Sequence, residues 1–290
     1  LRRDCKIPVW HDDQQGTATV EVAGAINALK VVGKKFEEAH FAIVGAGAAS
    51  LAIARLLLAT GTKPQNLCMC DSTGILNLER EELKTKYRQK WEICEKTDGA
   101  GKRGGLKEAL KGADIVIAAS KPGPGTIPPE YIDGMASDPI VFATANPVPE
   151  IWPWEAKERG AKVFATGRSD FPNQVNNSMG FPAIFRGVLD VRATTITDNM
   201  CLAAARELAK CAEEKGIHEE YIIPTMSETE VFYREAAAVG MQAQKDGVAK
   251  LKLSRQELYD KAKFMIDRSR GLTAKMMKDG FIKDCSGVVD

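Results

Sequence analysis

The chain has 290 residues, with 40 Lys and Arg against 39 Asp and Glu, so its formal net charge is +1. This balance excludes the strong positive field that attracts nucleic acid or an anionic membrane, and we expect neither as a partner. A hydrophobic content of 44% excludes a disordered chain, and no apolar run reaches the ~20 residues of a membrane span. Seven cysteines, an odd number, do not form a disulfide framework, so we expect a cytoplasmic protein.

The first predicted element is a helix over residues 17–32, in which apolar side chains recur every three residues. Shortly before it stand two adjacent carboxylates, Asp12 and Asp13. In one interpretation they cap the helix and offset its dipole, which is the commoner use of such a pair. In the other, one carboxylate binds a divalent cation while its neighbour orients a catalytic group. Two adjacent residues do not complete a metal site, so further ligands would have to come from elsewhere.

The next segment has the order of a dinucleotide-binding unit. We expect a strand at 41–44, a glycine turn at 45–50, a helix at 51–59 and a second strand at 67–70. Gly45 permits a tight turn, Gly47 lets the backbone approach a pyrophosphate, and the small Ser50 lets helix and strand pack closely. Asp71, at the end of the second strand, is placed to bind ribose hydroxyls, although a simple turn residue is the alternative. In this context we favour cofactor binding.

Further strands and helices predict the rest of an α/β domain. We expect helices at 79–92, 106–113 and 154–159, and strands at 115–119, 140–143 and 163–165. Unbroken apolar strands between helices indicate a parallel sheet that is covered on both faces. The fold class that follows is α/β, a Rossmann-like doubly wound parallel sheet.

The chain beyond residue 197 is predicted to be all-helical, with helices at 198–215, 227–245 and 254–277. Two serines, each followed three residues later by a glutamate, fit the capping box, in which hydroxyl and carboxylate satisfy each other's backbone N–H groups. These pairs are Ser227 with Glu230 and Ser254 with Glu257. We therefore divide the chain into a leading helix with the Asp pair (1–34), a Rossmann-like domain (35–196) and a helical C-terminal region (197–290).

Polar loops follow three of the predicted strands, at 119–123, 145–150 and 169–177. In open α/β sheets, ligands bind beyond the carboxyl ends of the strands. Asparagine suits such a site because its side chain both donates and accepts hydrogen bonds, to a nicotinamide amide or a substrate carboxylate. Ordinary turn chemistry is the alternative for any one loop, but three loops at strand ends favour a site.

Four of these segments, taken in order, resemble malic enzymes of the small bacterial type. They are HDDQQGTA at 11–18, the glycine turn at 45–50, ANPVPE at 145–150 and TGRSDFPNQVNN at 166–177. The resemblance implies oxidative decarboxylation of L-malate to pyruvate and CO2. It also implies NAD or NADP as the hydride acceptor and Mg2+ or Mn2+ as the Lewis acid.

The resemblance also implies roles for individual residues. Asp13 corresponds to a metal ligand, and Asp12 to a catalytic carboxylate that supports the lysine of the active site. Asn177 corresponds to a residue that contacts the substrate carboxylate, and Asn146 to one that lines the cleft between cofactor and substrate. The remaining residues correspond to the dinucleotide site, and they are Thr17 near the nicotinamide, Gly45, Ala46, Gly47, Ala48, Asp71 and Ser120.

The choice between NAD and NADP stays open, because Asp71 disfavours a 2′-phosphate whereas Lys121, in a nearby loop, favours one. In the family, the catalytic tyrosine, the catalytic lysine and two further acidic metal ligands lie upstream of the Asp-Asp motif, in an N-terminal domain. This chain begins at Leu1 rather than Met and contains no match to those motifs. We therefore expect it to hold the cofactor-binding half of a split site, to need the missing N-terminal domain of the same enzyme, and to form a homodimer. The alternatives are a non-catalytic dinucleotide-binding module for regulation or assembly, and another Rossmann dehydrogenase.

Overall fold

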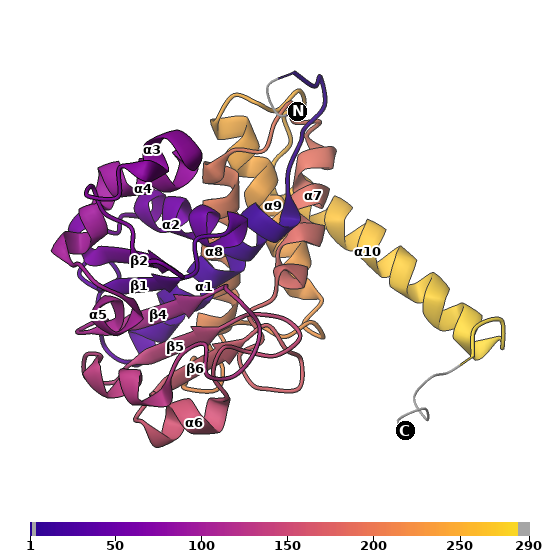
Figure 1. The fold of residues 1–290 in the computed structure, drawn as a ribbon. Coiled ribbons are helices and arrows are strands. Elements are labelled where there is room, and N and C mark those ends of the chain that lie inside the picture. Colours follow the sequence, from indigo (N-terminus) through magenta and orange to yellow (C-terminus); the bar gives the residue numbers. More distant parts are fainter. Residues whose placement is uncertain (2–3, 284–290) are drawn as a thin grey trace.

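The computed structural model describes residue 1 and residues 4–283. At its centre lies a six-stranded sheet in the order β3-β2-β1-β4-β5-β6 (Figure 1). The strands are β1 (Phe41–Val44), β2 (Leu67–Asp71), β3 (Gly74–Ile75), β4 (Ile115–Ala118), β5 (Ile140–Ala143) and β6 (Val163–Thr166). This order, with helices on both faces, confirms the predicted Rossmann-like α/β class.

The predicted parallel sheet is present, and one short edge strand that the sequence did not predict, β3, is added to it. Five strands run parallel, but β3 pairs with β2 in the antiparallel direction. Only Ser72 and Thr73 separate these two strands in the chain. So short a connection joins antiparallel strands, whereas parallel neighbours need a crossover of a dozen or more residues. The sheet is therefore mixed, with its antiparallel strand beside Asp71.

Both faces of the sheet are buried by apolar packing. On β1, Phe41 and Ile43 belong to one apolar cluster, while Ala42 and Val44 belong to the other. The same alternation continues along β2, β4, β5 and β6. Because successive side chains of a strand point to opposite faces, a strand that is covered on both sides needs an apolar residue at every position. This requirement explains the unbroken apolar runs in the sequence.

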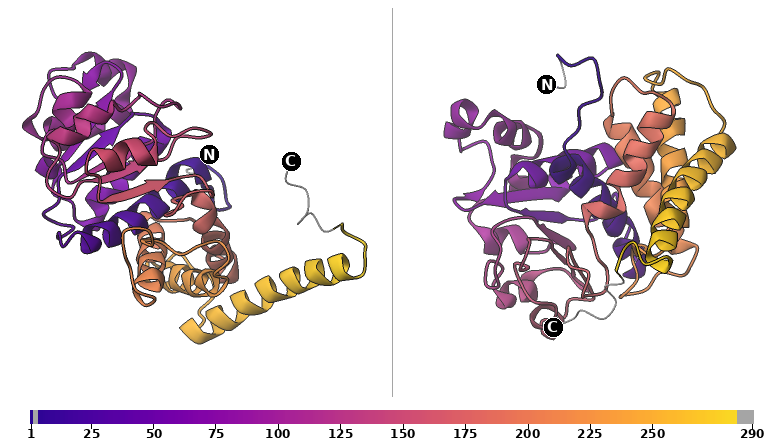
Figure 2. Two further views of the ribbon diagram at one scale, coloured as in Figure 1. Left: turned by 90° about the horizontal axis from the view of Figure 1, so that it is seen from below. Right: turned by 90° about the vertical axis from the view of Figure 1, so that its right-hand side faces the viewer.

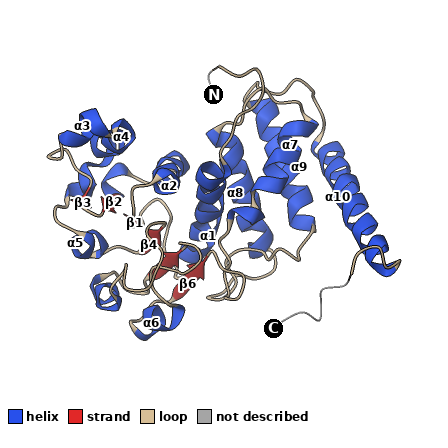
Figure 3. Ribbon diagram, turned by 45° about the vertical axis from the view of Figure 1, so that its right-hand side comes forward, coloured by secondary structure: helices blue, strands red, loops and turns tan. Residues whose placement is uncertain are grey.

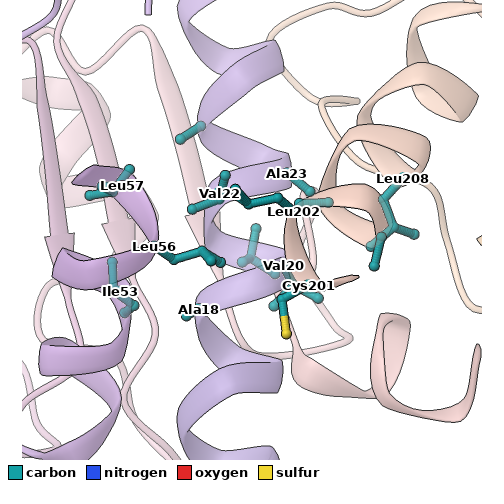
Figure 4. Packing of buried hydrophobic residues seen from close by; sticks show 14 of the residues in the cluster. Ala18, Val20, Val22, Ala23, Ile53, Leu56, Leu57, Cys201, Leu202 and Leu208 are labelled. Carbon is teal, nitrogen blue, oxygen red and sulfur yellow. The ribbon is translucent and has the colours of Figure 1, made fainter. Parts of the chain in front are cut away.

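Helices cover both faces of the sheet, and the last helices of the chain pack on other helices. They are α1 (Thr17–Val31), α2 (Ala48–Thr60), α3 (Glu82–Lys86), α4 (Arg88–Thr97), α5 (Leu106–Leu110), α6 (Pro153–Glu158), α7 (Phe181–Asp190), α8 (Asp198–Glu213), α9 (Glu230–Lys245) and α10 (Arg255–Lys278). α1 packs between α2 and α8, and Figure 4 shows Val20 and Val22 of α1 between Leu56 of α2 and Leu202 of α8. α5 and α6 contribute to the apolar cluster on the opposite face. The start of α1, which directly follows the turn with the Asp pair, is thereby held in place beside the sheet.

The last helices gather on one side of the molecule, next to α1 (Figure 3). α7, α8 and α9 pack against one another, and α10 begins against α9 and then extends away from the body (Figures 1 and 2). Of its residues, Leu258 and Ala262 near its start are buried. Among the helices of the described residues, none combines the length and the apolar composition that crossing a membrane requires.

One of the two predicted capping boxes is confirmed and the other is wrong. Ser254 Oγ accepts a hydrogen bond from Glu257 N (3.2 Å), and Glu257 Oε2 accepts one from Ser254 N (2.7 Å). The pair Ser227 and Glu230 forms no box because both side chains have other partners. The Ser227 hydroxyl contacts that of Thr225, and Glu230 accepts a hydrogen bond from a tyrosine of α10. α9 therefore begins at residue 230 instead of 227.

Two further differences concern the helices α3, α4 and α7. The helix predicted over 79–92 is instead α3 followed by α4, with a non-helical break at Tyr87. α7 is absent from the sequence prediction, because the dipeptide Phe181-Pro182 follows a loop motif. Proline is nevertheless tolerated in the first turn of a helix, where its missing N–H has no intrahelical partner.

Candidate functional site

The candidate site lies beyond the carboxyl ends of β1 and β4, where the strand order of the sheet reverses. The two strands are neighbours, with Val44 paired to Ala118. Ligands of open α/β sheets bind at such a switch point, because the connections leave it in opposite directions. Two adjoining cavities occupy it and share Gly47, Ala119 and Ser120 as wall residues. We call the one that contains Asp13 cavity A and the one that contains Asp71 cavity B.

The glycine turn after β1 forms a wall of both cavities. Gly45 has a φ of +99°, and an added Cβ would lie 2.8 Å from the Ala119 carbonyl oxygen, so only glycine fits. At Gly47 no atom lies within 4 Å of an added Cβ, which leaves the backbone open to a ligand. Ser50 Oγ donates to the Ala119 carbonyl (3.0 Å) and its small side chain ties α2 to β4. This is the geometry of a pyrophosphate-binding turn at a helix N-terminus.

Cavity A brings together residues from all four motif segments. Its volume is about 360 Å³, within the range of small-ligand sites. The sequence-predicted residues that line it are Asp13, Thr17, Gly47, Ala48, Ser120, Asn146 and Asn177. They come from the turn before α1, from the start of α2 and from the loops after β4, β5 and β6. Asp12 is not a wall residue of this cavity, but it contacts Asn177, which is one.

The Asp pair lies in a single π-helical turn, Asp12–Gly16, that leads into α1. Asp13 is exposed, whereas Asp12 is half-buried and accepts a hydrogen bond from Asn177 Nδ2, 165 residues away in sequence. Gly16 makes room for this carboxylate, because an added Cβ would overlap Asp12 Oδ1. Burial raises the pKa of Asp12, although the hydrogen bond from Asn177 acts to lower it. No side chain caps this turn or α1, so the pair does not act as a hydrogen-bonding helix cap.

Asp13 is the only acid among the residues that line cavity A, so these residues do not by themselves complete a metal site. Asp13 presents a carboxylate, the ligand type that Mg2+ and Mn2+ favour, and the side-chain amides of Asn146 and Asn177 lie on the same cavity. Within the described ranges, no group of three or more His, Cys, Asp or Glu side chains is arranged to hold a metal ion. The residues present therefore fit one edge of a coordination sphere and not the whole of it.

Glu150 holds the loops after β4 and β5 together, a role that sequence reasoning missed. Its buried carboxylate accepts hydrogen bonds from Ser120 N (2.8 Å), Ser120 Oγ (3.1 Å) and Ala145 N (3.1 Å). Because Ser120 and Ala145 both line cavity A, Glu150 positions two of its walls. Burial raises the pKa of Glu150, although its N–H donors act to lower it. The only signal in the sequence is its place at the end of the ANPVPE run, which does not distinguish a buried acid from an exposed one.

The loop after β6 packs closely on the loop after β5. An added Cβ at Gly167 would lie 3.3 Å from Asn146 Nδ2, so the glycine leaves space for that amide beside the cavity. Asn176 Nδ2 donates to the Gly167 carbonyl (3.0 Å) and holds this loop in place. The run of asparagines thus forms one wall of cavity A. Some of these residues line the cavity, and others hold the backbone of the loop after β6 in place.

Cavity B, of about 680 Å³, continues from the glycine turn to the end of β2. Gly45, Ala46 and Asp71, the remaining sequence-predicted residues, line it. So do Ser72, Thr73, Lys90 and Lys121. Cavities A and B together therefore contain every residue of the predicted site except Asp12.

Asp71 is paired with two cations that sequence reasoning missed. Arg80 Nη1 donates to its Oδ1 (2.8 Å), and Lys90 Nζ donates to its Oδ2 (2.7 Å). Partial burial acts to raise the pKa of Asp71, but these hydrogen bonds outweigh it and lower the pKa to about 2. In the sequence, Arg80 and Lys90 stand in a charged stretch that is typical of a solvated helix face, and nothing there indicates a shared partner.

The comparisons with known proteins agree on one family. The family model described as "Malic enzyme, NAD binding domain" matches residues 14–244. The chain is 42% identical over 263 residues to the bifunctional malic/malolactic enzyme of Bacillus subtilis, covering 91% of this chain and 63% of that protein. It is 43% identical over 265 residues to the NADP-dependent malic enzyme of Halomonas elongata (86% and 61% covered). It is 44% identical over 250 residues to the NAD-dependent malic enzyme of Geobacillus stearothermophilus (86% and 51% covered).

Solved structures give the same result. The crystal structure of Entamoeba histolytica malic enzyme matches with a TM-score of 0.95 and 50% identity, covering 98% of this chain and 59% of that chain. The malic enzyme from Pyrococcus horikoshii Ot3 matches with a TM-score of 0.91 and 47% identity, covering 96% and 65%. The chain thus spans between 51% and 65% of the length of these relatives. It belongs to the malic enzyme family.

Proposed function

We propose that this chain is the dinucleotide-binding part of an enzyme that oxidatively decarboxylates L-malate to pyruvate and CO2, with NAD or NADP as the hydride acceptor. The observation that carries the proposal is the meeting of all four motif segments at one switch point, in cavities A and B. The glycine turn supports dinucleotide binding. Asp13, Asn146 and Asn177, grouped beside it, support a small anionic substrate next to the nicotinamide. Membership of the malic enzyme family supports the same reaction.

We assign the dinucleotide to a path along the two cavities. Its pyrophosphate lies on the glycine turn, at Gly45, Ala46, Gly47 and Ala48, and its adenosine end lies toward Asp71. Its nicotinamide end lies in cavity A, near Thr17, Ser120 and Asn146. This path is supported by the open backbone at Gly47 and by the continuity of the two cavities.

Asn177 is assigned to the carboxylate of the substrate. Its side-chain amide has two N–H donors, and one of them goes to Asp12. The second N–H remains for the substrate, on the cavity wall that Asn177 shares with Asn146. Asp12 therefore orients the amide that binds malate.

Asp12 is assigned as the carboxylate that supports a catalytic lysine from outside this chain. Its Oδ1 is buried and has no hydrogen-bond partner among the described residues, while Oδ2 is held by Asn177. A buried carboxylate oxygen without a donor is costly, and a cationic N–H from an adjoining domain would satisfy it. This chain then binds and orients, and the groups that move protons come from elsewhere.

Asp13 is assigned as one ligand of Mg2+ or Mn2+, with the other protein ligands supplied by a domain outside this chain. When bound, such an ion stabilises the negative charge that develops on the substrate oxygen as hydride leaves and CO2 departs. The part of Asp13 is to place a carboxylate on cavity A beside the residues assigned to malate. The N-terminal domain of the same enzyme is the partner that we propose for completing the site.

We also propose that two copies of the protein associate and that it works in the cytoplasm. On α10, Met265, Leu272 and Met276 are exposed and continue, at heptad spacing, the stripe that begins with the buried Leu258 and Ala262. Such a stripe supports a contact with a second copy. The cysteines of the described part are thiols, which is compatible with a reducing compartment.

The test is malate-dependent formation of NADH or NADPH by the complete polypeptide, assayed with and without Mn2+. We expect turnover only with the metal ion. Asp13→Asn is expected to lower kcat/KM by about 100-fold or more, because the loss of a ligand weakens the metal ion's hold on the substrate oxygen. Dinucleotide binding, measured by calorimetry, should stay unchanged.

The matched control is Asp133→Asn, the same change at an exposed aspartate that pairs with Arg159 on the surface. It should leave kcat/KM at the level of the unaltered protein. Dinucleotide binding without any malate turnover would contradict the proposal and favour a non-catalytic binding module. Metal-independent turnover of a different substrate would contradict it in favour of another Rossmann dehydrogenase.

A further inference from the structure

A buried acid lies directly behind cavity A. Glu21 is on α1, one helical turn after Thr17, which lines the cavity. Its side chain is fully buried, and among the described residues no backbone N–H and no basic side chain donates to its carboxyl oxygens. Gly24, on the same face of α1, lets the helix approach β5, because an added Cβ would lie only 3.1 Å from the Phe142 ring. The Glu21 carboxyl thereby comes beside the hydroxyl of Thr144, the residue that follows β5.

Thr144 lines cavity A and joins two of its walls. Its Oγ1 donates to the carbonyl oxygen of Ala118 at the end of β4 (2.8 Å), and its backbone N–H donates to the same oxygen (3.0 Å). A hydroxyl has one proton, so Oγ1 can only accept a further hydrogen bond once that proton is used. A carboxylate cannot donate to it, whereas a carboxylic acid can.

Glu21 is such a donor at neutral pH. Burial raises the pKa of Glu21 to about 8 against the effect of the Thr144 hydroxyl, and the charge of Glu150 adds to the rise. The other charged side chains on the elements that pack against the start of α1 are exposed or have partners of their own. They are Arg55 on α2, Asp12 and Asp13 in the turn before α1, and Asp198, Arg206, Glu207, Lys210 and Glu213 on α8.

We propose that Glu21 is a positioning residue of the active site, which donates a hydrogen bond to Thr144 Oγ1 and so links α1, β5 and β4 behind cavity A. Each of these three elements adjoins a residue that we assign to the site. Asp13 precedes α1, Ser120 follows β4 and Asn146 follows β5. The inference rests on the proposed function, because it takes cavity A to hold the nicotinamide and malate.

Ionisation of Glu21 breaks this link. The carboxylate has no proton to donate, so the Thr144 hydroxyl can bond to it only by turning away from Ala118. The loops after β4 and β5 then lose a constraint on their relative position. Hydride transfer is sensitive to such a change, because a displacement of about 1 Å costs up to about 100-fold in rate. We therefore expect kcat to fall as the pH rises through the pKa of Glu21, at about 8.

Glu21→Leu tests the link by removing the polar group and keeping a side chain of similar size. For the complete protein at pH 7 we expect kcat for malate oxidation to fall about 10-fold or more. The Kd of the dinucleotide, measured by calorimetry, should change by less than about 3-fold, because the glycine turn still holds the pyrophosphate. The urea midpoint should stay equal or rise, since an apolar group replaces a buried carboxyl. A merely structural role would not lower the rate of a protein that is equally stable.

Glu21→Gln is the conservative variant, because its amide keeps an N–H donor and stays neutral at every pH. We expect its kcat at pH 7 to lie within about 3-fold of that of the unaltered protein. Between pH 7 and pH 9 the unaltered protein should lose more of its kcat than this variant, because only Glu21 ionises in that window.

Thr144→Val tests the other partner, because valine has the same shape without the hydroxyl. It should lower kcat by a factor similar to that of Glu21→Leu, and the double variant should lose no more than either single one. The matched control is Thr97→Val, which removes a buried hydroxyl that donates to the Ile93 carbonyl on α4, away from both cavities. It should leave kcat unchanged.

Three outcomes would overturn the inference alone. They are an unchanged kcat in Glu21→Leu, parallel pH profiles of Glu21→Gln and the unaltered protein, and fully additive losses in the double variant. If Glu21→Leu does not fold, as judged by circular dichroism, the pH profile of Glu21→Gln carries the test. If the unaltered complete protein binds the dinucleotide but oxidises no malate, the proposed function fails and the inference fails with it.

Discussion

Three carboxylates near the cleft show how differently single side chains are stabilised. Asp71 is paired with cations, and Glu150 accepts hydrogen bonds from backbone N–H groups and a hydroxyl. Glu21 on α1 is also fully buried, but no basic side chain or backbone N–H within the described residues donates to it. Burial, with a smaller contribution from the charge of Glu150, raises the pKa of Glu21 to about 8. Glu21 is therefore a neutral carboxylic acid at pH 7. Its effect on the free energy of unfolding depends on pH.

We predict that Glu21→Gln removes a pH dependence from the stability of the protein. Between pH 4.5, the ordinary pKa of the unfolded glutamate, and pH 8, the unfolded chain releases a proton that the folded chain keeps. The free energy of unfolding of the unaltered protein therefore falls as the pH rises through this window. The neutral amide avoids this loss, so the variant should be equally stable near pH 5 and more stable near pH 7, by up to about 3 kcal/mol.

Urea unfolding at pH 5, 6, 7 and 8 measures this difference. Glu158→Gln, at an exposed glutamate of α6, is the control and should follow the unaltered protein at every pH. Parallel curves for Glu21→Gln and the unaltered protein would contradict the assignment.

The roles of single residues were predictable only where a local sequence pattern indicates them. Gly45 and Gly47 stand in a glycine fingerprint, and their conformations follow from it. The partners of Asp71 lie 9 and 19 residues further along the chain, beyond a helix break. No rule of spacing connects them, so their charges are indistinguishable in sequence from those of a solvated surface.

The residue at which a helix begins depends on which hydrogen-bond partners the nearby side chains take, as the two serine–glutamate pairs show. At α10, Ser254 and Glu257 bond to each other's backbone N–H groups. At α9 the Glu228 carboxylate instead accepts from Thr225 N (2.7 Å) and organises the preceding turn. The same sequence pattern therefore gives a cap in one place and a loop in the other.

We predict that Ser254→Ala destabilises the first turns of α10 by about 0.5–2 kcal/mol, because the N–H of Glu257 loses its acceptor. Hydrogen exchange of the amides at 255–262 measures this loss. Ser227→Ala, the same substitution in the pair that forms no cap, should leave α9 unchanged. Equal effects of the two substitutions would show that the capping box of α10 contributes nothing.

Strands were more predictable than helices in this chain. The double burial of the sheet demands apolar residues throughout, so β1, β2, β4, β5 and β6 stand out in the sequence. β3 is only two residues long and lies at the edge, too short to show any pattern. The break at Tyr87 was equally hidden, because no glycine or proline in residues 79–97 marks it.

The cleft depends on the topology of the whole molecule. Asp13 and Asn177 lie far apart in sequence, and the packing of α1 beside the sheet places both on cavity A. The rule that ligands bind beyond carboxyl strand ends predicts that the loops after β4, β5 and β6 meet there. It says nothing about the Asp pair, which comes before the first strand, and only the family resemblance indicated that it belongs to the same site.

The most direct measurement is a crystal structure of the complete protein with its dinucleotide bound. The nicotinamide ring should lie in cavity A, beside Thr17 and Asn146, with the Asp13 carboxylate facing it and the adenosine in cavity B. A dinucleotide bound outside these cavities, or an Asp13 side chain directed away from the ring, would contradict the assignment of this chain as half of a malate-oxidising site.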